Sequence, residues 1–133
     1  MGEPMASNIA EKGHAMIVHD IASPADRAPE GAEIVQSNGE IARRAKLIAL
    51  SLTTVDANQA VIEEIVEAGQ AGSVIVDTCS IGLEAAAENA RVLEAVGIAY
   101  VDSPVSGMKF GAEAATLASM TSGSDNAIER ADL

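Results

Sequence analysis

Short apolar runs alternate with helix-length segments along almost the whole chain. Five runs are short and rich in aliphatic residues, as β-strands are: residues 15–18, 33–35, 47–50, 73–76 and 98–101. The segments between them, residues 4–12, 39–45, 56–68 and 83–96, have the length and composition of helices. Alternating strands and helices are typical of a parallel sheet with right-handed crossovers. The sequence therefore predicts an α/β fold with a mostly parallel, doubly wound sheet.

The segment 56–68 shows the helical pattern most clearly. Apolar residues recur there at spacings of three and four, and a row of glutamates lies on the opposite face. Asp56 is expected to cap this helix or to stand in its first turn. Further along, residues 116–121 suggest one more strand and residues 125–131 the beginning of another helix.

Composition narrows the class of protein. The 133 residues fit one domain, and with one Tyr, one Phe and no Trp the core must be aliphatic. A net charge of −12 argues against nucleic acid or an anionic membrane as partner. A single cysteine forms no internal disulfide, and neither a long apolar run nor a signal-like segment follows Met1, so we expect a cytoplasmic protein.

The most specific motif follows the last predicted strand. It reads Asp-Ser-Pro-Val-Ser-Gly at 102–107, with Gly-Ala at 111–112 and Thr-Leu at 116–117. A turn that exposes a hydroxyl and backbone N–H groups after a strand suits a small anion. Together with Met-Gly at 1–2 and Asp-Thr-Cys-Ser at 77–80, this loop resembles the 3-hydroxyisobutyrate dehydrogenase family of β-hydroxyacid dehydrogenases, and the resemblance covers essentially the whole chain.

The resemblance implies a Rossmann-like dinucleotide-binding domain that residues 1–133 represent in part, with no second domain in the chain. In the family, a first strand and two glycines precede the residues that match Met1 and Gly2. A helix with a catalytic lysine and then a helical domain follow the part matched here. We therefore expect a fragment of a dehydrogenase, with the catalytic lysine beyond Leu133 and with weak NAD binding by the isolated chain.

Six positions inherit the family's cofactor contacts. Gly2, with Met1, stands where a helix begins and its free N–H groups face a pyrophosphate. Asp20, expected at the end of the strand that starts near residue 16, would accept hydrogen bonds from the adenosine ribose and repel a 2′-phosphate. This favours NAD and leaves NADP open. The alternative is that Asp20 only caps the following turn.

The other inherited cofactor contacts follow the third and fourth strands. Leu52 and Thr53 match a Leu-Pro turn in the family, and Ser80 matches the hydroxyl residue beside the nicotinamide. Cys79 stands where serine is usual, and because no activating base accompanies it we expect it to be a packing residue.

The substrate contacts implied by the resemblance are Ser106, Gly107 and Met108, which would hold the carboxylate and hydroxyl of a hydroxy acid. Met108 replaces the family's second glycine, and its Cβ is expected to restrict the backbone. Ala115 replaces another glycine. The two histidines show no metal-ligand spacing, so no metal site is predicted.

The resemblance implies hydride transfer between NAD(P) and a small 3-hydroxy acid, by a parent enzyme that is a homo-oligomer. Which 3-hydroxy acid is used stays open. A different class of function is a noncatalytic nucleotide-binding or interaction module. An imine reductase would share the N-terminal pattern, but the loop at 103–107 disfavours it.

Overall fold

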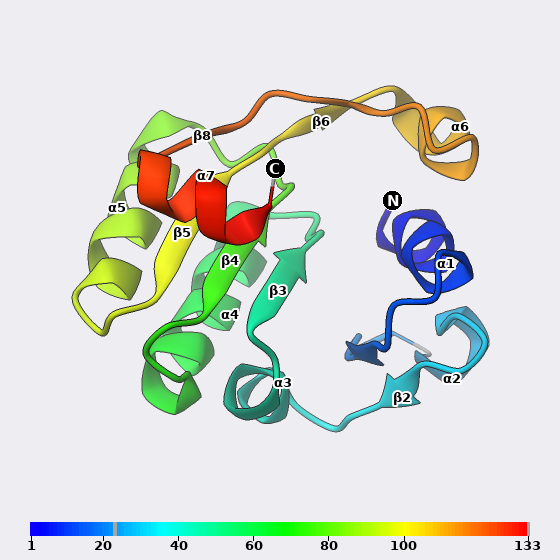
Figure 1. Ribbon diagram of the computed structural model, residues 1–133, viewed down its shortest axis with the longest axis horizontal. Coiled ribbons are helices and arrows are strands. Elements are labelled where there is room, and N and C mark those ends of the chain that lie inside the picture. Colours follow the sequence, from blue (N-terminus) through cyan, green and yellow to red (C-terminus); the bar gives the residue numbers. More distant parts are fainter. Residues whose placement is uncertain (23, 133) are drawn as a thin grey trace.

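The computed structural model describes residues 1–22 and 24–132 (Figure 1). Helices alternate with strands through the first two thirds of the chain, as the sequence predicts. The elements are α1 (Gly2–Glu11), β1 (Ile17–Val18), α2 (Pro24–Arg27), β2 (Glu33–Ile34), α3 (Asn38–Arg44), β3 (Leu47–Leu50), α4 (Val55–Ala68), β4 (Val74–Asp77), α5 (Leu83–Glu94), β5 (Ala99–Asp102), β6 (Val105–Ser106), α6 (Met108–Glu113), β7 (Ala118–Ser119), β8 (Ser122–Gly123) and α7 (Asp125–Ala131).

The main sheet has the strand order β3-β4-β5-β8. Its first three strands are parallel and in register, with Leu47 opposite Val74 and Val74 opposite Ala99, whereas β8 runs antiparallel to β5. The prediction of a mostly parallel α/β fold is therefore confirmed. The strands do not form one sheet, however: within the described residues β1 and β2 form a separate parallel pair, and β6 and β7 an antiparallel ribbon.

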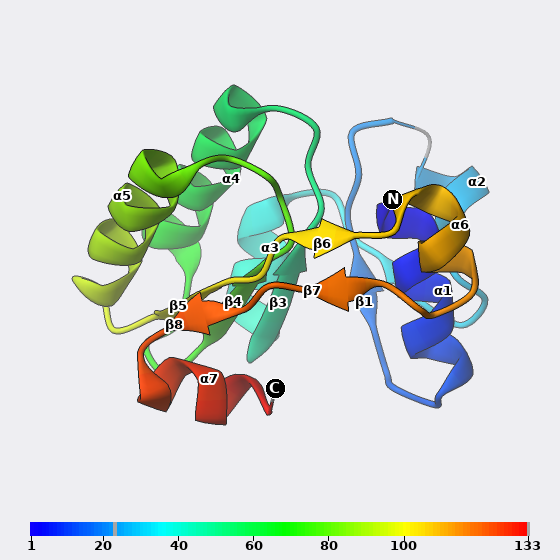
Figure 2. The same ribbon diagram turned by 90° about the horizontal axis from the view of Figure 1, so that it is seen from above.

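Helices cover both faces of the main sheet, with α4 and α5 on one side and α7 on the other (Figure 2). The larger core lies under α4 and α5, where Ile65, Ile75 and Leu93 are at most 1% exposed. A smaller core packs Val74 and Val101 against Ala127 and other residues of α7. Because both faces are covered, β4 is buried along nearly its whole length, as its run of Val and Ile predicts.

Hydroxyl side chains cap three of the helices. The Thr54 side chain accepts a hydrogen bond from the Ala57 backbone N–H (3.1 Å) at the start of α4. Asp56 therefore stands in the first turn, where an acid is favourable, and is not the cap. Ser37 and Ser124 cap α3 and α7 in the same way.

Several short elements differ from the sequence prediction. Of the strand predicted at 116–121 only Ala118–Ser119 is a strand, β7, and β8 begins just after the predicted range. The first strand ends at Val18, two residues before Asp20. The elements α2, β6 and α6 have four, two and six residues, too few for a periodic pattern, and were not predicted. In the described part of the chain, every helix is too short or too polar to cross a membrane.

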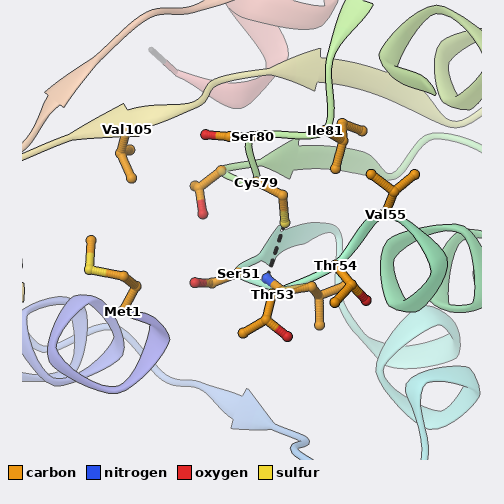
Figure 3. A pocket seen from close by; sticks show the side chains of 11 residues that line it. Met1, Ser51, Thr53, Thr54, Val55, Cys79, Ser80, Ile81 and Val105 are labelled. Carbon is orange, nitrogen blue, oxygen red and sulfur yellow. Dashed lines mark hydrogen bonds between the residues drawn. The ribbon is translucent and has the colours of Figure 1, made fainter. Parts of the chain in front are cut away.

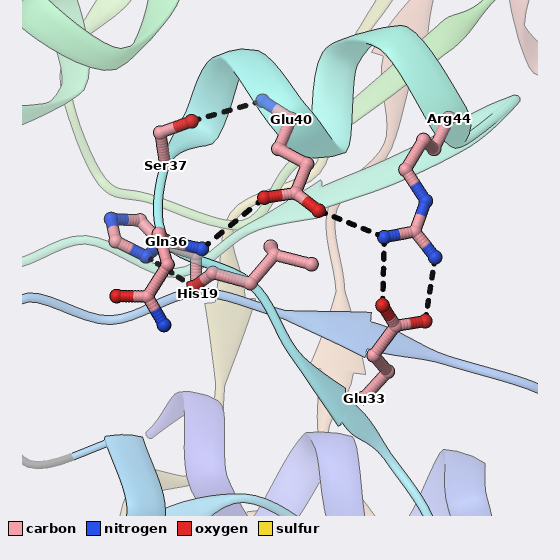
Figure 4. Close-up of polar contacts among 7 residues, drawn as sticks. His19, Glu33, Gln36, Ser37, Glu40 and Arg44 are labelled. Atoms are coloured by element: carbon pink, nitrogen blue, oxygen red, sulfur yellow. Dashed lines mark hydrogen bonds and ion pairs between the residues drawn. The ribbon is translucent and has the colours of Figure 1, made fainter.

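Two sets of contacts join the N-terminal part, from α1 to β2, to the rest of the molecule. The β6–β7 ribbon carries α6 to α1 (Figure 2), where the Asn8 side-chain amide donates to the Ala112 carbonyl at 2.7 Å. On the other side, Arg44 of α3 pairs with Glu33 of β2 (2.5 Å) and with Glu40 (3.0 Å), as Figure 4 shows. These ion pairs are exposed, so their contribution to stability is small.

Two neighbouring aliphatic residues on β3 allow a test of which face of this strand is buried. Ile48 is 6% exposed and Leu47 is 54% exposed. We expect Ile48→Ala to lower the free energy of unfolding by about 2–5 kcal/mol, because it leaves a cavity, and Leu47→Ala to lower it by less than about 1 kcal/mol. Urea titration of both variants measures the difference, and equal losses would contradict the burial pattern.

Candidate functional site

A pocket of about 420 Å³ opens at the carboxyl ends of β3 and β4, facing the start of α1 (Figure 3). This is the edge at which parallel α/β sheets bind ligands. The lining comes from the segments that follow β3 and β4, from Met1 just before α1 and from Val105 at the start of β6. The lining residues are Met1, Ser51, Leu52, Thr53, Thr54, Val55, Thr78, Cys79, Ser80, Ile81 and Val105.

Among the residues that the structure describes, no charged side chain lines the pocket, although the chain carries 20 Asp and Glu residues. Five lining residues bear hydroxyl groups instead. Two helices also begin at the pocket: α1, whose first-turn N–H groups donate no hydrogen bond to the Met1 side chain, and α4, which Thr54 caps. Helix N-termini carry partial positive charge and present N–H donors. The pocket therefore suits an uncharged or anionic ligand that accepts hydrogen bonds.

Beneath the pocket, a buried carboxylate ends the central strand. Asp77 is fully buried and accepts hydrogen bonds from the Asn58 side-chain amide (2.7 Å), the Tyr100 hydroxyl (2.9 Å) and the Cys79 backbone N–H (3.0 Å). Asn89 donates in turn to the Asn58 oxygen (2.7 Å). Sequence reasoning missed both asparagines. The available signal was a polar residue within the apolar stripe of each helix, at 58, 62 and 65 in α4 and at 86, 89 and 93 in α5.

Cys79 joins the two loops that line the pocket. Its sulfur accepts a hydrogen bond from the Leu52 backbone N–H (3.1 Å), which Figure 3 marks as a dashed line. Burial, and to a smaller degree the Asp77 carboxylate, raises the pKa of the Cys79 thiol to about 12. A thiol with that pKa is neutral at pH 7, so it is a poor nucleophile. The geometry agrees with a packing role for Cys79.

Four of the six predicted cofactor residues lie together, since Met1, Leu52, Thr53 and Ser80 all line the pocket. Gly2 is next to it: a Cβ added there would meet the Ser51 Cβ at 3.4 Å.

Asp20 lies outside the lining, in the exposed turn after β1, where its carboxylate accepts a hydrogen bond from the Ala22 N–H at 2.7 Å. This is the turn-capping contact that the sequence left open as an alternative. The neighbouring His19 ring lies 3.1 Å from the Val35 carbonyl oxygen (Figure 4). Within the described residues, no three His, Cys, Asp or Glu side chains gather as metal ligands would.

The predicted substrate residues extend away from the pocket toward α6. Val105 lines the pocket, Ser106 pairs with Ala118 in the β6–β7 ribbon, and Gly107, with φ +137°, is the N-cap residue just before α6. Met108 follows with its side chain 81% exposed.

The positions where glycines of the resembled family are replaced adopt a backbone conformation that favours glycine. Met108 has φ +54° and Ala115 has φ +53°. For a residue with a Cβ this left-handed region costs about 1–2 kcal/mol. The prediction that a Cβ at Met108 restricts the backbone is consistent with this strain, which both positions share.

Residues 1–132 match the family described as the NAD-binding domain of 6-phosphogluconate dehydrogenase. The chain belongs to this family. The 2-(hydroxymethyl)glutarate dehydrogenase of Eubacterium barkeri is 34% identical over 98% of the chain and 45% of its own length. The chain thus spans less than half of this relative.

Solved structures of other proteins have the same fold as this chain. The 3-hydroxyisobutyrate dehydrogenase of Mycobacterium tuberculosis, solved with L-serine, matches with a TM-score of 0.90 at 28% identity, covering 98% of this chain and 46% of its own. An imine reductase of Streptomyces aurantiacus matches with a TM-score of 0.83 at 27% identity, covering 97% and 46%. The Rossmann-like fold implied by the sequence resemblance is therefore confirmed.

Neighbouring alanines test the backbone strain in the loop of this NAD-binding domain. Ala115→Gly should raise the free energy of unfolding by about 0.5–1 kcal/mol, because relief of the left-handed strain exceeds the entropy cost of glycine. Ala114, with φ −83°, is the matched control, and Ala114→Gly should lower the same quantity by about 0.5–1 kcal/mol. Urea titration gives both values. A loss of stability in both variants would refute strain at Ala115.

The pKa of Cys79 gives a second test. The rate of alkylation by iodoacetamide should rise about tenfold per pH unit between about pH 7 and pH 11, because only the thiolate reacts. In the chain unfolded by urea, the alkylation rate should level off above about pH 9, because an ordinary thiol is then mostly ionised. A plateau near pH 9 in the folded protein would show that the thiol is neither buried nor affected by Asp77.

Proposed function

We propose that the pocket binds the nicotinamide and pyrophosphate parts of NAD, and that the whole protein is an NAD-dependent 3-hydroxyacid dehydrogenase. The observation that carries the proposal is the uncharged, hydroxyl-lined pocket at the carboxyl ends of parallel strands, onto which α1 opens without a side-chain cap. In a chain of net charge −12, a lining free of carboxylates favours an anionic dinucleotide.

Each assigned residue has a distinct task in this proposal. The first turn of α1, with Met1 and Gly2, would receive the pyrophosphate on its backbone N–H groups. Ser80 and the Leu52–Thr53 turn would border the nicotinamide, which when bound supplies the hydride acceptor and donor. Asp20 would accept hydrogen bonds from the adenosine ribose. The Ala22 N–H donates to Oδ1 of this carboxylate, and Oδ2 would serve the ribose.

The substrate assignment concerns the loop after β5. The Ser106 hydroxyl and the Gly107 N–H would hold the carboxylate of the acid. Their position in the sequence directly after Val105, which lines the pocket, supports this assignment. Two relatives, the Eubacterium and Mycobacterium enzymes, are named for acids in which a hydroxymethyl group is attached to the carbon beside a carboxylate. A small 3-hydroxy acid is therefore the substrate class we favour.

For the whole protein we further propose a homo-oligomer that works in the cytoplasm, without nucleic acid or membrane as a partner. The net charge of −12 supports the part of this proposal that concerns nucleic acid and anionic membranes, because it would repel both. The alternative function is a noncatalytic nucleotide-binding module, which shares the pocket but needs no hydroxy acid. Reduction of NAD in the presence of a panel of 3-hydroxy acids, assayed with the full-length protein, separates the two.

The choice of cofactor depends on Asp20. We expect NADH to bind at least about tenfold more tightly than NADPH, because the carboxylate repels a 2′-phosphate. Asp20→Asn keeps the oxygen that accepts from Ala22 and should reduce that ratio to about threefold or less. Fluorescence titration of the reduced cofactors measures both.

The control is Asp26→Asn, which removes an exposed carboxylate from the adjacent helix α2. It should leave the ratio of the two dissociation constants unchanged. Equal effects of the two substitutions would refute a specific role for Asp20, and absence of saturable NADH binding by the unsubstituted full-length protein would refute the pocket assignment itself.

A further inference from the structure

A chain of buried hydrogen bonds runs from α5 to the lining of the pocket. Asn89 on α5 donates to the Asn58 oxygen on α4, and the Asn58 amide donates to Asp77 at the end of β4, both at 2.7 Å. These three residues are at most 2% exposed. None of them lines the pocket, and none has a task in the proposed reaction.

The chain of hydrogen bonds has a fixed direction. The Asp77 carboxylate, as an anion, only accepts hydrogen bonds, so Asn58 must present its NH2 group to it. The Asn58 oxygen then faces Asn89, which must donate. Without that donor, the Asn58 oxygen would be unpaired where water does not reach, and the side chain would gain by turning away from Asp77.

The same series of hydrogen bonds continues into both loops that line the pocket. The second Asp77 oxygen accepts from the Cys79 N–H at 3.0 Å, and the Cys79 sulfur accepts from the Leu52 N–H at 3.1 Å. Cys79 and Leu52 both line the pocket. The orientation of a side chain on α5 is thus transmitted, hydrogen bond by hydrogen bond, to the turns after β4 and β3.

We propose that Asn89 and Asn58 are positioning residues that hold the Cys79–Ser80 turn and the Leu52 turn in the arrangement that binds the cofactor. The cofactor part of this inference rests on the proposed function, whereas the positioning of the turns does not. If the asparagines were only part of the core, their removal would affect the pocket no more than an equal loss of stability elsewhere in α5.

Cys79 provides a local reporter because it is the only cysteine in the chain. Two variants remove the donor: Asn89→Ala, and Asn89→Leu, which keeps the volume of the side chain. Leu93→Ala is the control, since Leu93 is fully buried one turn further along the same helix and lies outside the hydrogen-bonded chain. Alkylation of the thiol by iodoacetamide is followed at increasing urea concentrations below the unfolding transition.

Both Asn89 variants should react at least about tenfold faster than the unsubstituted protein without urea, because an unpaired buried acceptor opens the turn locally. This rate should change little with urea, as local opening exposes little surface. In Leu93→Ala the rate should depend on urea as steeply as global unfolding does. A wild-type rate in Asn89→Leu, or a urea dependence equal to that of the control, would overturn the inference. If Asn89→Ala does not fold, Asn89→Leu decides alone.

Titration with NADH separates this inference from the proposed function. Both Asn89 variants should bind NADH at least about tenfold more weakly, with Leu93→Ala unchanged under conditions where all are folded. Unchanged NADH binding in the Asn89 variants would overturn the positioning role while leaving the pocket assignment intact. Faster alkylation in the Asn89 variants of a protein that binds no NADH would overturn the pocket assignment and leave the positioning of the turns intact.

Discussion

The buried carboxylate of Asp77 determines how the elements around the pocket are arranged. An anion removed from water must be satisfied by donors from its surroundings, at a cost of several kcal/mol if they are lacking. Here α4 supplies Asn58, β5 supplies Tyr100 and the turn after β4 supplies the Cys79 N–H. Burial and the charge of Asp77 raise the pKa of Tyr100, so its hydroxyl remains protonated and donates. The positions of two elements and one turn of the chain thus follow from a single charge.

The same arrangement explains how an acidic chain forms a pocket suited to an anion. Asp77 lies under the pocket, but its oxygens are engaged by three donors and covered by protein. The exposed Glu33 and the half-buried Glu40 pair with Arg44 of α3 (Figure 4), and neither glutamate lines the pocket. Beside apolar side chains, the groups that face the pocket are therefore hydroxyls and the starts of two helices, whose partial charges are positive.

The amino-acid sequence predicts the main sheet and much of the pocket, because apolar runs set the strands and ligands bind where parallel strands end. Leu52, Thr53 and Ser80 lie at such strand ends, and the family resemblance singles them out there as cofactor contacts. The division into separate sheets does not, because a strand pattern does not specify which strand pairs with which. The buried asparagines escape prediction for a different reason: one Asn in an apolar stripe is also compatible with a helix edge, and only the carboxylate opposite gives Asn58 and Asn89 their role.

The loop after β5 shows tertiary contacts overriding local preference. Met108 and Ala115, at either end of the α6 region, both adopt positive φ, which their Cβ atoms oppose. The conformation is maintained because α6 must reach α1, where Ala112 accepts the hydrogen bond from Asn8. Since α1 also faces the pocket from the N-terminal side, a ligand held between its first turn and the turns after β3 and β4 would contact both parts of the molecule. Binding there would stabilise the folded arrangement of the two parts, which the contact between α6 and α1 also holds despite the strain at Met108 and Ala115.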